Sequence, residues 1–584
     1  MYDDLLLKVN KPAQYMGKEI NCAKKDFNKA NVKFAISFPD LYEVGMSNLG
    51  LKIIYSLLNS VSDVICDRFF SPNKDMEELL RQNNRRILSL DSRREINEFD
   101  FVGFSLGSEL DYTNVLNILD LGDVPLKASL RGNEHPLIVG GGPCTLNPEP
   151  MHAFFDFFVI GEAEDILFEI IDIYRRHKNE YKSGRLNKQE LLFKISQIEG
   201  VYVPSFYEVS YGKRGRITGF KPKAESSPVK IKKRFVKDIN SVYYPLDWVV
   251  PYTQIIHDRI TLEIMRGCPN RCIFCQARSQ YFPLRVKDTE RLLDLAAGLY
   301  KHTGYEEISL AGLSVSDHPG IENIIKELTC LFSPKTVSLS LPSLKAKSLI
   351  GDASSLIAKV KKTGLTFAPE AGSEKLRDIL RKDFSSDDFF KALEQAYQSG
   401  YQHVKLYFMI GLPREDNDDL DAIIDFSVRV SELKRKTGKG PAGVNISINT
   451  LIPKPHTALQ WLRMDNLDSI KSKQEYLIMK ARKHKRLVLS FHNRSMSFIE
   501  GILSRGDRRL SEVILAAYKK GAKFDAWSSY FDFDKWTSAF ADLNIDPEEY
   551  LGQKEIEDIL PWDFIDTGVN KDILKDEFNE IMAS

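Results

Sequence analysis

The stretch TLEIMRGCPNRCIFCQA, residues 261–277, decides the fold of this chain. Its first part is apolar and stops at a glycine, a pattern typical of a buried strand that ends in a turn. Cys268, Cys272 and Cys275 follow with C-x3-C-x2-C spacing. Thiolates are the usual ligands of iron–sulfur clusters, and three on one loop can hold three irons of a four-iron cluster. We therefore predict a 4Fe-4S cluster whose fourth iron is open to a small molecule.

Zinc is the alternative metal for this loop. Structural zinc sites take four ligands, often as two C-x2-C-like pairs. The sequence holds no second pair, so His257 or His302 would have to supply the fourth ligand. The other four cysteines are scattered, which is typical of free thiols in a reducing compartment.

Strand and helix patterns alternate downstream of the cysteine loop. Helical patterns such as ERLLDLAAGLYKH separate the strand candidates, as a series of parallel βα units requires. The strand candidates after TLEIMRG are EEISLAG (306–312), TVSLSLP (336–342), LTFAPEA (365–371), HVKLYFMIG (403–411) and GVNISINT (443–450). We predict a partial (β/α)6 barrel over residues 249–465.

A similar alternation precedes the loop. The runs VKFAISF (32–38), FVGFSLG (101–107), PLIVGGG (136–142) and FFDFFVIGEAE (154–164) alternate with helical patterns. This arrangement predicts a Rossmann-like, doubly wound parallel sheet over residues 1–200, so the fold class is α/β. Residues 466–584 carry few strand signals and predict an α-rich C-terminal domain that packs on the barrel.

Residues 201–248 form a basic segment that reads as a hairpin or a loose linker. Further basic runs occur at 480–486 and 504–509. Such runs can bind RNA phosphates, and the alternative is a solvated linker and a charged helix face. The basic residues of the first segment are Lys213, Arg214, Arg216, Lys221, Lys223, Lys230, Lys232, Lys233, Arg234 and Lys237.

Bulk properties place the protein among globular chains of ordinary composition. Lys plus Arg and Asp plus Glu number 81 each, so net charge points to no polyanionic partner. No apolar run reaches the ~18–20 residues that cross a bilayer. The first residues, MYDDLLLKVN, are acidic where a signal peptide is basic, so we expect a cytoplasmic protein without a membrane partner.

The cysteine loop resembles the signature of the radical S-adenosylmethionine (SAM) superfamily, in which an aromatic residue precedes the third cysteine. Three later strand ends also resemble that superfamily, in the same order: ISLAGLSVSD (308–317), FAPEAGSEKLRD (367–378) and YFMIGLPRED (407–416). The resemblance implies that the open iron binds SAM. It assigns the remaining SAM contacts to Phe274, Ala311, Gly312, Glu370, Ser373 and Gly411. Ala311-Gly312-Leu313 replaces the common glycine-glycine-acid, which leaves only backbone contact there.

The N-terminal domain resembles the cobalamin-binding domains of class B radical SAM enzymes. The segment DLYEVG (40–45) after the first strand matches the D-x-H-x-x-G motif of these domains, with tyrosine in place of the cobalt-binding histidine. The resemblance implies cobalamin held without a protein ligand on cobalt. Its candidate contacts are Asp40, Tyr42, Gly45, Ser105, Leu106, Gly140 and Gly141. The alternative is a domain that keeps the fold, has lost cobalamin and serves as a substrate or docking module. Cys144 lies beside the glycines, where it either faces the ligand or is a small buried thiol.

Almost the whole chain resembles one radical SAM family with such an N-terminal domain. Its marks include YEVGMSNLGLKIIY, LPSLKAKS (341–348), PKPHTALQW and MSFIEGILSRGDRRLSEVI. The resemblance implies reductive cleavage of SAM, with methyl transfer to an unactivated carbon as the leading reaction, and an electron donor such as flavodoxin or ferredoxin. The basic segments favour RNA or protein as substrate. Candidate general bases are Glu370, Tyr42 and His456. A non-catalytic iron–sulfur factor that binds RNA or protein is the alternative.

Overall fold

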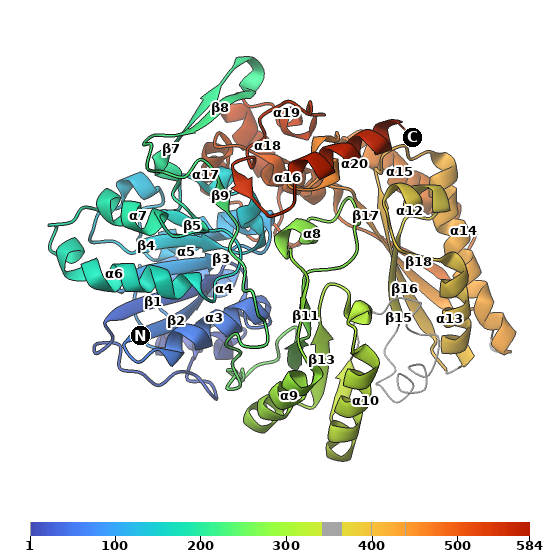
Figure 1. The fold of residues 1–584 in the computed structure, drawn as a ribbon, viewed down its shortest axis with the longest axis horizontal. Helices are drawn as coiled ribbons and strands as arrows, with labels where there is room; N and C mark the ends of the chain where they lie inside the picture. The colour runs from blue at the N-terminus through green and yellow to red at the C-terminus, as the bar shows by residue number, and fades with distance from the viewer. Residues whose placement is uncertain (1, 341–364, 399, 439, 584) are drawn as a thin grey trace.

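The computed structural model describes residues 2–340, 365–398, 400–438 and 440–583. Two α/β bodies lie side by side and helices from the C-terminal part of the chain lie across the top of both (Figure 1). The segment LPSLKAKS lies outside the described residues. No helix among the described residues is long and apolar enough to cross a membrane.

The N-terminal body is a six-stranded sheet with the order β2-β1-β3-β4-β5-β6. All neighbours are parallel except the last pair, so the doubly wound sheet predicted from the sequence is confirmed. The strands are β1 (Val32–Phe38), β2 (Val64–Phe70), β3 (Phe101–Ser105), β4 (Leu137–Gly141), β5 (Phe157–Val159) and β6 (Val201–Tyr202). The chain reverses direction across the sheet between β1 and β3, where such folds bind ligands beyond the carboxyl ends of the strands.

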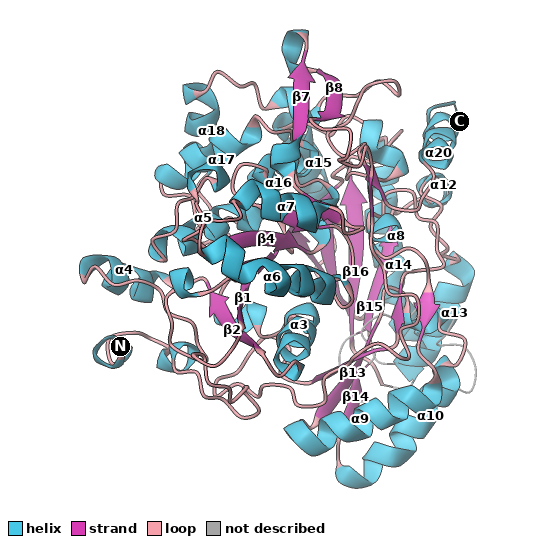
Figure 2. Cartoon of the chain, turned by 60° about the vertical axis from the view of Figure 1, so that its left-hand side comes forward, coloured by secondary structure: helices cyan, strands magenta, loops and turns pink. Residues whose placement is uncertain are grey.

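Helices cover both faces of this sheet, because its strands are apolar on both sides (Figure 2). They are α3 (Leu49–Ser60), α4 (Lys74–Gln82), α5 (Tyr112–Leu121), α6 (Ile166–Lys182) and α7 (Lys188–Ser196), with the short α1 (Asp3–Leu6) and α2 (Tyr42–Gly45). The hairpin β7 (Tyr207–Tyr211) and β8 (Ile217–Pro222) follows and stands out from the body (Figure 1).

The second body is built from parallel strands in two sheets, β10-β13-β14 and β15-β16-β17-β18. The strands are β10 (Ile260–Glu263), β13 (Glu307–Ala311), β14 (Ser338–Ser340), β15 (Leu365–Glu370), β16 (His403–Ile410), β17 (Gly443–Thr450) and β18 (Leu487–Phe491). The outer helices are α9 (Thr289–Thr303), α10 (Ile321–Phe332), α12 (Glu374–Ile379), α13 (Ser386–Gln398), α14 (Asn417–Leu433) and α15 (Leu467–Ala481). Each strand expected from the sequence is present, and β18 extends the second sheet past residue 465.

The C-terminal helices pack on both bodies rather than on the barrel alone. Asn147 of the N-terminal body donates to the carbonyls of Ser504 and Gly506, and Thr113 donates to Asp525 at 2.7 Å. A short parallel bridge joins β9 (Ile231–Lys232) to β19 (Ile565–Asp566). The helices are α16 (Arg494–Arg505), α17 (Leu510–Lys519), α18 (Phe533–Asp542), α19 (Glu548–Leu551) and α20 (Lys571–Ala583).

Candidate functional site

The three cysteines lie between β11 (Met265–Arg266) and α8 (Ala277–Gln280), just past the carboxyl end of β10. All three are partly buried. Burial raises the pKa of Cys272 to about 11, with smaller effects from Lys382 and from the other two thiols. The thiols of Cys268 and Cys275 both raise the pKa of Cys272, so the three cysteines lie near one another. A bound cation would supply the positive charge that these thiolates otherwise lack.

This arrangement fits a cluster better than a single zinc ion. In the described part of the chain, no group of three or more His, Cys, Asp or Glu side chains has the geometry to hold one ion. His302 pairs with Asp247, and His257 lies 3.4 Å from Arg259. A cluster of four irons spreads its sulfur ligands farther apart than one ion, whose sulfur ligands all lie about 2.3 Å from it.

Lys233 supports the far end of the cysteine loop. It is 3% exposed, and its Nζ donates to the carbonyls of Ser279, Gln280 and Phe282 at 2.6, 3.0 and 2.8 Å. The first two carbonyls belong to the end of α8 and the third lies just beyond it, so the ammonium group occupies a position where a helix end favours a cation. From the sequence we assigned Lys233 to a basic linker. In an extended segment, however, residues two apart point to the same side, so Lys233 lies on the same side as the buried Ile231.

The residues expected to contact SAM lie at strand ends around the loop. Ala311 ends β13 beside Glu263, the last residue of β10. A Cβ on Gly312 would lie 2.7 Å from the side chain of Met265, so glycine lets these two segments of the chain approach closely. Glu370 ends β15 with a φ of +69° and pairs with Lys382 at 3.2 Å. Its charge is one of the influences on Cys272, which places it near the cysteines.

The other three expected contacts have local partners. Ser373 caps α12 through Leu376 and donates to Asp419 at 2.6 Å. The backbone of Gly411 has a φ of +79° and donates to Glu415 at 3.0 Å. Phe274 packs against the apolar group that contains Ile273 and Ala371. SAM contact at these positions stays a prediction.

A cavity of about 700 Å³ lies between the two bodies. On one side it is bounded by the carboxyl ends of β1, β3, β4 and β5, and on the other by β10, β11 and α8. Arg266 and Gln280, which bracket the cysteine loop, both line it. Asp40, Ser105, Gly140 and Gly141, expected from the sequence, are in its wall. The cavity therefore brings the ligand edge of the doubly wound sheet to the cysteine loop.

Glycines open the cavity at its floor. A Cβ on Gly141 would meet nothing within 4 Å among the described residues and would project into open space, whereas one on Gly140 would strike the ring of Phe158 at 2.4 Å. Gly142 has a φ of +98°, a backbone region that L-residues avoid. Side chains at these positions would fill the space or distort the turn, so the floor can accept a large flat ligand close to the backbone.

Three of the expected cobalamin contacts are absent from the described cavity wall. The hydroxyl of Tyr42 donates to Glu19 at 2.8 Å inside a buried cluster with Arg68. Gly45 lies against the ring of Phe70, where a Cβ would stand 2.2 Å from it. Leu106 is buried, and its N–H donates to the Gly141 carbonyl at 2.7 Å, which fixes the glycine turn.

A buried charge network joins the two bodies at the cavity wall. Glu162, just past β5, binds Arg285 at 2.7 and 2.8 Å and Arg266 at 3.2 Å. Arg266 also pairs with Glu164 at 2.6 Å and with Glu263 at 2.8 Å. The network holds the residue two positions before Cys268 against the N-terminal body. No sequence pattern indicates this network, because its acidic and basic residues come from distant segments of the chain.

His456 and Cys144 lie deeper. The Nε2 of His456 is 3.1 Å from the carbonyl of Leu146, and burial lowers its pKa to about 4, so the ring is neutral and bridges the bodies. Cys144 is buried beside Tyr112 and Lys454, and burial raises its pKa. Neither belongs to the described cavity wall. Their placement favours structural roles.

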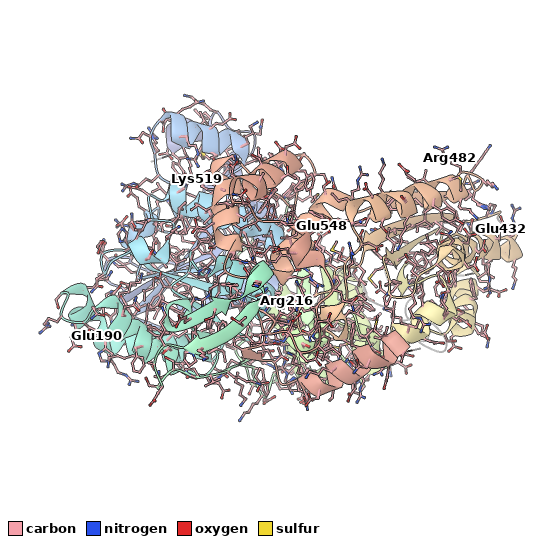
Figure 3. The ribbon with its side chains drawn as sticks, turned by 90° about the horizontal axis from the view of Figure 1, so that it is seen from above. Glu190, Arg216, Glu432, Arg482, Lys519 and Glu548 are labelled. Atoms are coloured by element: carbon pink, nitrogen blue, oxygen red, sulfur yellow. The ribbon has the colours of Figure 1, made fainter. Side chains whose placement is uncertain are left out.

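The basic runs are dispersed over the molecule. Arg216 on the hairpin and Arg482 after α15 lie on different parts of the surface (Figure 3). Arg508 forms an ion pair with Glu149 at 2.7 Å, and Arg509 forms one with Asp507 at 2.9 Å.

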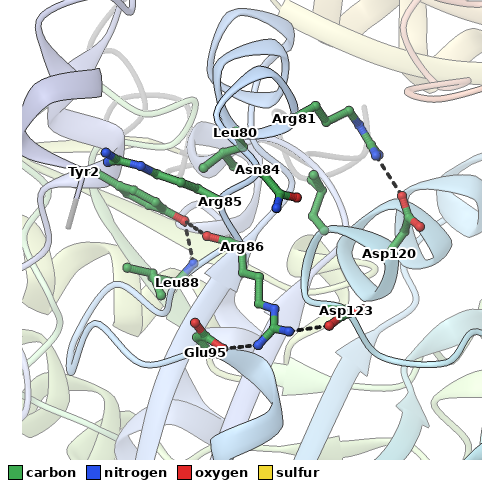
Figure 4. A pocket seen from close by; sticks show the side chains of 11 residues that line it. Tyr2, Leu80, Arg81, Asn84, Arg85, Arg86, Leu88, Glu95, Asp120 and Asp123 are labelled. Carbon is green, nitrogen blue, oxygen red and sulfur yellow. Dashed lines mark hydrogen bonds and ion pairs between the residues drawn. The ribbon is translucent and has the colours of Figure 1, made fainter.

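A separate polar cavity lies near the N-terminus (Figure 4). The charged side chains that line it pair with one another: Arg86 binds Glu95 and Asp123, and Arg81 binds Asp120.

Comparisons with known proteins agree with this architecture. Residues 50–204 match the family model "Radical SAM proteins, N-terminal", and residues 262–427 match "Radical SAM superfamily". Protein MJ0966 of Methanocaldococcus jannaschii is 28% identical over 514 residues, which span 88% of this chain and 97% of that protein. The methyltransferase PH0819 of Pyrococcus horikoshii is 22% identical over 310 residues, 51% of this chain and 59% of its own.

A solved structure has the same fold. The radical SAM methyltransferase TsrM from Kitasatospora setae, solved with cobalamin and a [4Fe-4S] cluster bound, superposes with a TM-score of 0.52 at 13% identity. The match covers 84% of this chain and 99% of that one. At this identity the likeness concerns the fold, and both bodies of the chain take part in it.

Proposed function

We propose that this chain, a radical SAM enzyme, binds a corrinoid in the cavity between its two bodies and transfers a methyl group to an unactivated carbon. One observation carries the proposal. The cavity joins the carboxyl edge of a doubly wound sheet, at its switch point, to the helix that follows the cysteine loop. The glycine floor supports a large planar ligand, and TsrM, which shares the fold, holds cobalamin.

The chain's own residues would hold the two cofactors and exclude water from them. Cys268, Cys272 and Cys275 would hold three irons, and Lys233 would keep the loop in place through α8. The cluster would supply one electron to the sulfonium of SAM, and the corrinoid would supply a transferable methyl group. Glu370 would contact the polar groups of SAM, because it lies partly buried near Cys272 with Lys382 as its partner.

We also propose the partners that this chemistry needs. A low-potential one-electron carrier such as flavodoxin or ferredoxin would reduce the cluster, and the cytoplasm would keep the thiols reduced. For the substrate we propose RNA or protein. The support is the hairpin of β7 and β8, which stands out from the body (Figure 1) and carries the exposed Lys213 and Lys221. Binding of RNA would weaken steeply with salt, whereas a small substrate would show little salt dependence.

Cleavage of SAM tests the proposed chemistry. The protein is reconstituted anaerobically with iron and sulfide, loaded with hydroxocobalamin, and given SAM and dithionite; 5′-deoxyadenosine and S-adenosylhomocysteine are measured. We expect SAM cleavage in the wild type and in Cys330→Ala, an exposed thiol outside the loop, and a loss of at least about a hundredfold in Cys272→Ala. An intact cluster without cleavage in the wild type would favour a non-catalytic iron–sulfur factor.

A further inference from the structure

The C-terminal helix α20 lies against the helix that follows the cysteine loop (Figure 1). Glu577 on α20 is 3% exposed. Its carboxylate accepts from Arg278 of α8 at 2.9 and 3.1 Å, and from Arg381, just past α12, at 2.8 Å. One buried carboxylate therefore joins the end of the chain to two segments of the barrel.

Both arginines belong to segments that contact the cysteine loop through the backbone. The N–H of Arg278 donates to the carbonyl of Cys275 at 3.3 Å and also interacts with the sulfur of that cysteine. Inside the loop, the N–H of Ile273 donates to the carbonyl of Leu380 at 3.2 Å. Leu380 directly precedes Arg381. The positions of the two arginines therefore affect the loop at a cluster ligand and at the residue between two ligands.

An apolar contact continues along the same face of α20. Ile581 follows Glu577 by four residues, so the two side chains are neighbours on the helix surface. Ile581 is 5% exposed and belongs to one buried cluster with Ile273 and Leu380. The helix thus contacts the cysteine loop and its support with a charged side chain at one turn and an apolar side chain at the next.

Glu577 should contribute far more to this contact than its neighbour Glu580. The side chain of Glu577 is 4% exposed, whereas that of Glu580, which also binds Arg381, is 67% exposed. Removal of a buried carboxylate leaves its cations without compensation, whereas an exposed ion pair contributes little in water. The two glutamates therefore form a matched pair of positions on one helix.

We propose that Glu577 is a positioning residue for the cluster, which holds the cysteine loop in its binding geometry through Arg278 and makes α20 part of the cluster site. A loop that is already ordered loses less entropy when it binds the irons. The charges of the contact also act on the bound cluster, whose reduction potential depends on nearby charge. The inference rests on the cluster of the proposed function and does not depend on the corrinoid.

Alkylation of the cysteines in the full chain without cofactors tests the inference. Mass spectrometry follows each cysteine in iodoacetamide, with the exposed Cys330 as reference and the fully buried Cys66 as reporter of global unfolding. We expect Cys275 to react at least about tenfold faster in Glu577→Gln than in the wild type, because the loop opens more often. In Glu580→Gln the rate should stay within about twofold of the wild type.

A double-variant cycle tests whether Glu577 acts through Arg278. Arg278→Gln should also speed the alkylation of Cys275. The variant with both changes should react no faster than Glu577→Gln alone, because the two changes remove one shared interaction. Rates that multiply in the double variant would mean that the two residues act independently, which would overturn the inference.

The reduction potential of the reconstituted cluster gives a readout that a looser loop alone would not produce. Glu577→Gln removes a negative charge beside the loop, and Arg278→Gln removes a positive one. The midpoint potential should therefore rise in the first variant and fall in the second. A loop that merely admitted water would shift both potentials in the same direction, and that result would contradict the inference.

The outcomes separate the inference from the proposed function. Wild-type alkylation of Cys275 in Glu577→Gln would overturn the inference and leave the proposed function standing. Fast alkylation of Cys66 would mean that this variant unfolds, and Arg278→Gln then decides by the same criteria. A wild-type chain that binds no cluster would remove the proposed function, while the alkylation rates would still show whether α20 holds the loop.

Discussion

Burial raises the pKa of Asp525, which lies where the C-terminal segment packs on the N-terminal body. Asp525 is fully buried, accepts from Thr113 at 2.7 Å and from the Trp536 indole at 3.2 Å, and has its pKa raised to about 6, chiefly by burial. Because the folded value lies above the unfolded one, the folded protein binds more protons between about pH 4 and 6. This residue therefore reduces stability as the pH rises through that window.

Replacement of Asp525 by Asn should remove this penalty. At pH 7.5 the variant should be more stable than the wild type by about 2–3 kcal/mol, the worth of a shift of roughly two units. At pH 4, where the wild-type carboxyl is protonated in the fold, the difference should vanish. Urea unfolding of the unloaded protein at both pH values measures it. A variant that is less stable at pH 7.5 would show that the carboxylate itself is needed by its two donors.

The elements were largely predictable from the sequence, and the contacts between them were not. VKFAISF, FVGFSLG and HVKLYFMIG appear as β1, β3 and β16, because apolar runs rich in β-branched and aromatic residues specify buried parallel strands. β18 escaped prediction because it is short, follows a basic run and leaves Val488 60% exposed. That the cysteine loop and the later strand ends lie near one another could also be predicted, since parallel strands bring their carboxyl ends together.

The wall of the cavity needed the structure. Asp111 and Glu162 come from segments far from the cysteine loop that Arg266 and Gln280 flank, and no local pattern marks these four side chains as neighbours. Tyr42 occupies the histidine position of the D-x-H-x-x-G motif, yet its hydroxyl donates a hydrogen bond to the buried Glu19. A sequence motif predicts the strand end at which its residues lie. The direction in which each side chain points depends on packing against distant segments of the chain.

The charge network around Glu162 joins the N-terminal body to the segments that flank the cysteine loop. Glu162→Gln should lower the free energy of unfolding by about 3 kcal/mol, because it removes the carboxylate that pairs with the largely buried Arg285 and one of the three that pair with Arg266. Glu169→Gln is the matched control: its partner Arg234 is partly exposed, so the loss should stay below about 1 kcal/mol. Urea unfolding of both variants measures the difference. Equal losses would mean that the network is dispensable.

At the scale of the whole molecule, the C-terminal helices and the charge network hold two α/β bodies around one cavity. Asn147, Thr113 and Arg508 each connect the N-terminal body to the C-terminal segment. The doubly wound sheet contributes a glycine floor, and the barrel contributes the cysteine loop and α8. The central claim is that this architecture places a cluster and a corrinoid at the walls of one cavity.

Electron paramagnetic resonance of the doubly loaded protein tests that claim most directly. The cluster is reduced to its paramagnetic state in protein that carries cob(II)alamin, and the spectrum is compared with those of protein loaded with either cofactor alone. The account predicts magnetic coupling between the two centres, seen as broadened and faster-relaxing signals, because both border the same cavity. A spectrum equal to the sum of the two single-cofactor spectra, with both centres fully loaded, would contradict it.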